Sequence, residues 1–215
     1  MNIRLGIYEI FSRIIPGGVY LAALAQLVSV TGLYPLDWTM FNNLSLISSA
    51  AMVVAAYLLG GVLDRLAIFW FLIFKPRGMS GRVLQSFKQK HQERWEMDFE
   101  DEEWGTLLAF IRIKHLDVAN EIDRHNALSI MLRNVSLGFL FLVANQVIEF
   151  FSTIQIPHLI LGLVLVIVSI LLVIEARRFR EFFYTTIYET ILAYRINLED
   201  RIKPVPPNEK PALKE

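Results

Sequence analysis

Four long runs of this sequence contain no charged residue, and this pattern constrains the fold more than any other feature. The runs cover residues 14–34, 44–63, 134–148 and 157–174. A helix that crosses a bilayer needs about 20 mostly apolar residues, so the short third run needs its flanks to span. The sequence therefore predicts an all-α integral membrane protein: four transmembrane helices with helical cytoplasmic extensions.

The composition supports this class. Apolar residues make up 54% of the chain and charged residues 20%, which excludes a disordered chain and disfavours a soluble enzyme domain. The absence of cysteine excludes disulfides, thiolate metal sites and cysteine nucleophiles. A removable signal peptide is the alternative for the first run. However, that run is long, and residues 3–14 before it have the spacing of an interfacial amphipathic helix.

The basic residues predict how the chain is threaded. Residues 1–13, 75–133 and 175–215 carry two, ten and eight of the 21 Lys and Arg residues, whereas the turns at 35–43 and 152–156 carry none. Short loops rich in Lys and Arg stay in the cytoplasm. We therefore expect a multi-pass protein of the inner (plasma) membrane with both termini cytoplasmic.

Five segments follow from this threading. We expect an interfacial helix with the first hairpin at 1–74, a cytoplasmic helical insert at 75–133, the second hairpin at 134–174, a cytoplasmic amphipathic helix at 175–203 and a disordered tail at 204–215. The insert is basic at 75–94 and acidic at 96–103, so its acidic end should lie away from anionic lipid.

Helical spacing predicts the elements of the cytoplasmic part. A helix is expected at 83–95, and a long helix over 104–151 returns to the membrane, with a kink expected near Gly138. Residues 179–198 carry an apolar stripe that needs a partner. The returning helix of the insert is the nearest one, in this subunit or in a neighbour.

Small residues form stripes on the first two spans. The candidates for helix packing are Gly18, Ala22, Ala25, Ser29, Ala56 and Gly60. Helices in lipid associate through the close approach that small side chains allow. Two interpretations stay open: packing of the two spans within one subunit, or a subunit interface or pore lining.

Two polar groups lie within or beside the runs. Asp64 and Arg65 form either a pair at the cytoplasmic boundary or an intramembrane pair that gates or holds subunits. Asn145, Gln146 and Glu149 share one face of the third span. They serve either interhelical hydrogen bonding or, in an oligomer, a carboxylate ring at a cation-selective pore mouth.

The sequence carries no recognisable catalytic or cofactor motif. It lacks a P-loop, a G-x-G-x-x-G and a G-x-S-x-G sequence, so we expect no enzyme activity and no cofactor. Asp117, Glu121 and His125 are spaced as helical metal ligands, but without an H-E-x-x-H or a cysteine pair we expect solvated charges and no metal.

The predicted function is a non-enzymatic, homo-oligomeric membrane protein that couples its cytoplasmic helical domain to the bilayer. It would act as a channel-like effector, or as a scaffold or sensor for a soluble cytoplasmic partner, with no nucleic-acid contact. By analogy of layout alone, bacterial defence or stress response is one setting for it. The alternatives are a small secondary transporter, which needs an ionisable residue near the midplane, and a lipid-modifying membrane enzyme.

Overall fold

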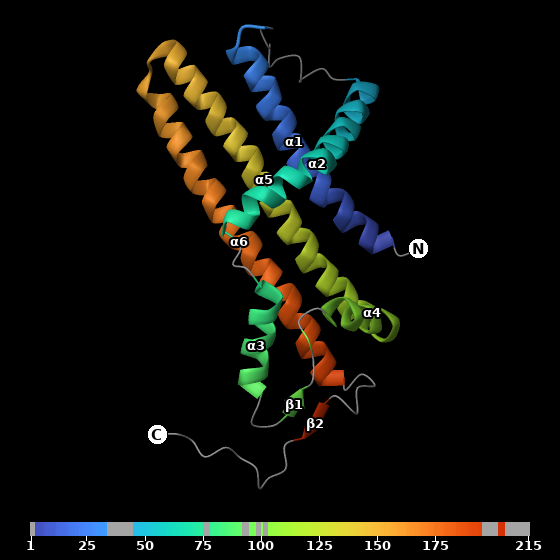
Figure 1. Cartoon of the computed structure of the whole chain (residues 1–215). Coiled ribbons are helices and arrows are strands. Elements are labelled where there is room, and N and C mark those ends of the chain that lie inside the picture. Colours follow the sequence, from blue (N-terminus) through green and yellow to red (C-terminus); the bar gives the residue numbers. More distant parts are fainter. Residues whose placement is uncertain are drawn as a thin grey trace, which may run out of the picture. The chain divides into compact units, whose positions relative to one another are not determined.

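The computed structural model describes residues 3–33, 45–74, 78–91, 95–97, 100, 103–194 and 202–204. Its helices are α1 (Ile3–Val30), α2 (Leu46–Phe74), α3 (Met79–His91), α4 (Trp104–Lys114), α5 (Leu116–Thr153) and α6 (Ile156–Tyr194). Strands β1 (Trp95–Met97) and β2 (Ile202–Pro204) form one short antiparallel pair (Figure 1). The turn expected at 35–43, half of the acidic run at 96–103 and nearly all of the tail lie outside the described residues.

Four helices are long and apolar enough to cross a membrane, as predicted. The candidate spans are Ile10–Val30, Leu46–Phe74, Leu116–Thr153 and Ile156–Tyr194. The chain divides into two compact units. The first unit contains Met1–Lys75 and Ala127–Arg178, and the second contains Pro76–Asn126 and Phe179–Glu215.

Three helix boundaries differ from expectation. The helix expected over 104–151 is interrupted at His115, whose backbone (φ −139°, ψ 71°) leaves the helical region between α4 and α5. The break lets the buried face of α4 fold back onto the start of α5 in one apolar core. Helix α3 begins and ends earlier than the expected helix at 83–95, and Trp95 belongs to β1. Helix α1 runs from Ile3 to Val30 through Pro16, so the expected interfacial helix at 3–14 and the first span form one helix.

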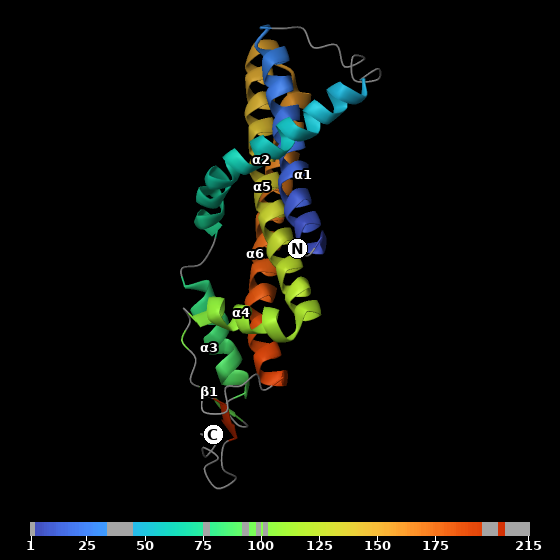
Figure 2. The same cartoon turned by 90° about the vertical axis from the view of Figure 1, so that its right-hand side faces the viewer.

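Helices α5 and α6 form a long antiparallel hairpin, seen from its broad side in Figure 1 and from its edge in Figure 2. The Ser136 hydroxyl donates to the Ser169 carbonyl at 2.8 Å, and seven residues away on each helix the Ser129 hydroxyl donates to the Ala176 carbonyl at 2.7 Å. Gly162 lies a further seven residues back on α6, where an added Cβ atom would lie 3.6 Å from the Gln146 side chain of α5. A seven-residue repeat of small residues keeps one seam facing the partner helix. Large apolar side chains are exposed on the rest of this part of α6.

Helices α1 and α2 cross with their backbones in contact. A Cβ atom on Gly17 would lie 1.7 Å from the Ala56 carbonyl oxygen, and one on Gly60 would lie 2.1 Å from the Arg13 carbonyl oxygen. At the same crossing the Arg13 guanidinium donates to the Tyr57 hydroxyl at 3.1 Å. Only glycine fits at these two positions, so the crossing point is fixed by the sequence.

The second unit has its own apolar core. It is built from one face each of α3 and α4, the first turns of α5 and the last turns of α6, and its members include Leu84, Phe87, Leu108, Ile111, Ile122, Phe183, Ile187 and Ile191. The apolar stripe predicted on α6 therefore packs against the insert of the same chain, which is one of the two partners that the sequence left open. Tyr194 stacks on His115 at its edge, with ring centroids 3.9 Å apart.

The glycine crossing gives a matched pair of variants. Gly17→Ala should lower the free energy of unfolding by about 1–3 kcal/mol, because the added methyl group meets backbone that cannot move aside. Gly18→Ala should leave stability unchanged or slightly higher, because nothing lies within 4 Å of its added Cβ atom. Thermal unfolding in detergent, followed by tryptophan fluorescence, measures both. Equal losses in the two variants would contradict the crossing.

Candidate functional site

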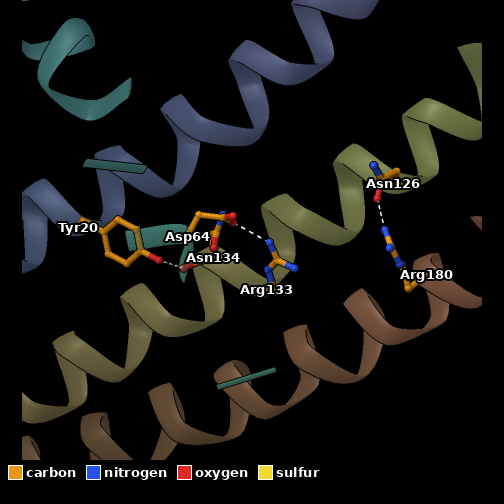
Figure 3. A network of polar contacts seen from close by, with 6 residues as sticks. All are labelled: Tyr20, Asp64, Asn126, Arg133, Asn134 and Arg180. Atoms are coloured by element: carbon orange, nitrogen blue, oxygen red, sulfur yellow. Dashed lines mark hydrogen bonds and ion pairs between the residues drawn. The ribbon is translucent and has the colours of Figure 1, made fainter. Parts of the chain in front are cut away.

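A polar centre joins three helices of the first unit. It consists of Tyr20 on α1, Asp64 on α2, and Arg133 and Asn134 on α5 (Figure 3). The Asp64 Oδ1 atom accepts hydrogen bonds from Arg133 Nη2 at 2.6 Å and from Asn134 Nδ2 at 2.9 Å. The Tyr20 hydroxyl donates to the Asn134 carbonyl at 2.7 Å.

Burial makes this centre costly to break. Asn134 is 0% exposed, the Arg133 side chain is 14% exposed and that of Asp64 is 34% exposed. A mostly buried guanidinium is stabilised only while its carboxylate partner stays in place. The Asp64 carboxylate is already engaged with two donors, so the arrangement is suited to holding helices together rather than to transferring protons.

The structure brings Asp64 to Arg133 rather than to its neighbour Arg65. Arg65 is exposed, and the Asp64 carboxylate contacts Arg133 and Asn134 instead. The positions of the two residues in the sequence indicate that Arg133 is the partner of Asp64. Asp64 directly follows the second uncharged run, and Arg133 directly precedes the third. Charges at matching ends of two spans lie at one level when the spans pack side by side.

A buried serine contact lies next to the polar centre. Ser136 and Ser169 are both 0% exposed, and each hydroxyl donates to the carbonyl of the other residue, at 2.8 and 2.9 Å. The indole N–H of Trp70 on α2 donates to the Ser136 hydroxyl at 2.9 Å. This contact connects α2, α5 and α6. Sequence reasoning missed Ser136 because a serine in an apolar run shows no partner.

The second predicted polar group lies near the turn between α5 and α6. Asn145 is buried, and its side-chain amide donates to the Ala23 carbonyl of α1 at 2.7 Å. Gln146 Oε1 lies 3.1 Å from His158 Nδ1, and the same nitrogen lies 3.6 Å from a Glu149 carboxylate oxygen. The structure therefore places all three predicted residues in contacts between helices.

The predicted small residues divide into two sets. Ala56 and Gly60 lie at the crossing of α1 and α2, where Gly17, which the sequence stripe did not include, makes the closest approach. Gly18, Ala22 and Ala25 line an open apolar groove of about 760 Å³ between the diverging helices, together with Ala51, Ala55 and Ala56, and Ala56 thus belongs to both the crossing and the groove. Ser29 is half-buried and is not part of the groove lining.

The second unit carries its own polar contacts. Arg180 donates to the Asn126 side chain (Figure 3), and its guanidinium lies 4.8 Å from the Phe183 ring centroid. Arg112 pairs with Asp123 at 2.8 Å. Within the described part of the chain, no group of three or more His, Cys, Asp or Glu side chains could hold a metal ion.

The fold and the site define a helical protein with four span-length helices joined by buried polar contacts. Comparison with protein-family models, with curated proteins and with solved structures finds no match for this chain. Its function must therefore be argued from its own geometry.

The polar centre generates a prediction about stability. Asp64→Ala leaves Arg133 mostly buried without its carboxylate, and should lower the free energy of unfolding by roughly 1–3 kcal/mol, the lower end reflecting the partial exposure of Asp64. Arg65→Ala, at the exposed neighbour, should change it by less than about 0.5 kcal/mol. Denaturant titration in mixed micelles measures both. The double variant with Arg133→Ala should be less destabilised than the sum of the single variants; strict additivity would show that no pair exists.

Proposed function

We propose that this chain is a non-enzymatic integral protein of the inner (plasma) membrane that couples the second unit to the bilayer, as a scaffold or sensor for a soluble cytoplasmic partner. In this proposal α1, α2, α5 and α6 cross the membrane, and both termini and the second unit are cytoplasmic. One observation carries the proposal: α5 and α6 are each a single unbroken helix whose residues belong to both units.

Continuous helices give the proposal its mechanical basis. Residues 127–153 of α5 and 156–178 of α6 belong to the first unit, and the remaining turns of both helices belong to the second. Within the first unit the helices are joined at Ser129 and Ser136, and within the second unit Asn126 contacts Arg180. A helix backbone is hydrogen-bonded at every turn and resists bending. In this proposal the two continuous helices use that stiffness to carry a displacement from one unit to the other.

The contacts of the polar residues favour a scaffold or sensor over the channel-like effector and the transporter. A pore or a transport site needs polar side chains that face a path through the membrane. Asn145 donates to a backbone carbonyl, Gln146 contacts His158, and Asp64 is paired with Arg133. These groups are used in joining helices. A homo-oligomer remains part of the proposal, and native mass spectrometry in detergent would give the subunit number.

The orientation can be tested with reporter tags. A tag inserted at Gln89 in α3, or added at the C-terminus, should report a cytoplasmic location, because 20 of the 21 basic residues lie on that side. A tag at Asn42 should report the opposite side. A Gln89 tag found outside the cytoplasm would overturn the orientation and the coupling that depends on it.

Coupling between the units predicts an effect at a distance. Asp64→Ala should increase amide hydrogen exchange by several-fold not only around residues 60–70 and 130–140 but also in the last turns of α6, including Ile187 and Ile191, which are fully buried. Exchange followed by mass spectrometry in nanodiscs measures this. Arg65→Ala serves as the matched control. A change confined to the first unit would refute the coupling while leaving the fold intact.

A further inference from the structure

The last turns of α2, residues 66–74, lie across the α5–α6 hairpin rather than along it. Asp64 contacts Arg133, and six residues later Trp70 contacts Ser136 of the same helix, only three positions on. The next residue, Phe71, packs with Val173 and Ala176 of α6. A helix advances about 10 Å over seven residues. If α2 ran alongside α5, a step of six residues on α2 would move its contact by about six residues on α5, but the contact moves by only three. Helix α2 therefore crosses both α5 and α6 here (Figures 1 and 2).

The outward face of this transverse segment is apolar and uncovered. Phe69 is 69% exposed and Ile73 is 72% exposed, and Leu66 and Leu72 are about half exposed. This face continues the exposed stripe that Leu58 and Val62 form on the preceding turns of α2. A patch of this kind indicates an interaction surface.

The segment lies at the level where charge returns to the neighbouring helices. Arg133 immediately precedes the third uncharged run, and Glu175 and Arg178 follow the fourth, next to the Ala176 that Phe71 contacts. Arg65, which immediately precedes the segment, is exposed. An apolar face beside an exposed cation at a charge boundary matches the junction of acyl chains and anionic headgroups.

We infer that α2 crosses the bilayer within residues 46–63, and that its last turns, residues 66–74, form an in-plane membrane segment. This segment binds the acyl chains of the cytoplasmic leaflet through Leu66, Phe69 and Ile73, with Arg65 at the lipid phosphates. This inference rests on the membrane insertion and orientation proposed above, and it names the leaflet as the partner of that segment. Through Asp64, Trp70 and Phe71, the segment connects the leaflet to α5 and α6.

Site-directed spin labelling tests the inference, and the cysteine-free sequence needs no prior substitutions. The labelled variants are Leu66→Cys, Phe69→Cys and Ile73→Cys, in phosphatidylethanolamine–phosphatidylglycerol vesicles. Collision with oxygen and with a water-soluble nickel complex gives the depth of each label. All three labels should be open to oxygen and should lie within about 5 Å of one depth, against the roughly 10 Å change along a helix that leaves the membrane. Leu163→Cys, on the exposed face of α6, is the lipid-facing reference.

Three other outcomes of the labelling experiment would each overturn the inference. Labels that become progressively more open to nickel from Leu66 to Ile73 would show that α2 leaves the bilayer, and would overturn the inference. Labels closed to both reagents would mean that protein, such as a second copy of the chain, covers this face, and would overturn it equally. If the Leu163 label is itself open to nickel, the proposed membrane insertion fails as well, so the two failures are distinguishable.

Discussion

Hydrogen bonds from α5 to each of the other three candidate spans hold the first unit together. Asn134 and Asn145 connect α5 to α1, Arg133 and Ser136 connect it to α2, and Ser129 and Ser136 connect it to α6. In an apolar solvent, burial of hydrophobic surface gives no preference between protein and lipid, so close packing and such bonds decide which helices associate. Without them, four separately stable helices would have no defined arrangement.

The polar contacts of α5 lie at two separate levels along the helix, and together they fix its orientation. The polar centre lies where the uncharged runs of α2 and α5 end, and the contacts of Asn145 and Gln146 lie near the turn between α5 and α6. The α5–α6 pair is thus tied to α1 or α2 at two separate levels. Two ties fix the tilt and the rotation of a helix pair, whereas one would leave it free to pivot.

The sequence predicts the elements of this fold better than their partners. The length and apolarity of a segment are properties of its own residues, so the sequence alone predicts the four span-length helices and the apolar stripe on α6. The break at His115 has no proline or glycine to signal it and comes from packing of α4 on α5. Helix α1 approaches α2 at Gly17 rather than at Gly18 because of its rotation about its own axis. That rotation also places Val19 and Tyr20 of α1 against Gly138 of α5. Arg133 as the partner of Asp64 required three-dimensional proximity.

The seven-residue seam between α5 and α6 limits the kind of movement that this hairpin can transmit. Ser129 and Ser136 each donate to a carbonyl of the other helix, at two places separated by two turns. If α5 slid lengthwise along α6, both hydrogen bonds would break together, and the small residues of the seam would no longer face the partner helix at the same positions. Tilting or rotating the hairpin together with α1 and α2, to which it is tied, preserves these two bonds. In the proposed coupling, a signal would therefore tilt the hairpin, with little sliding of α5 along α6.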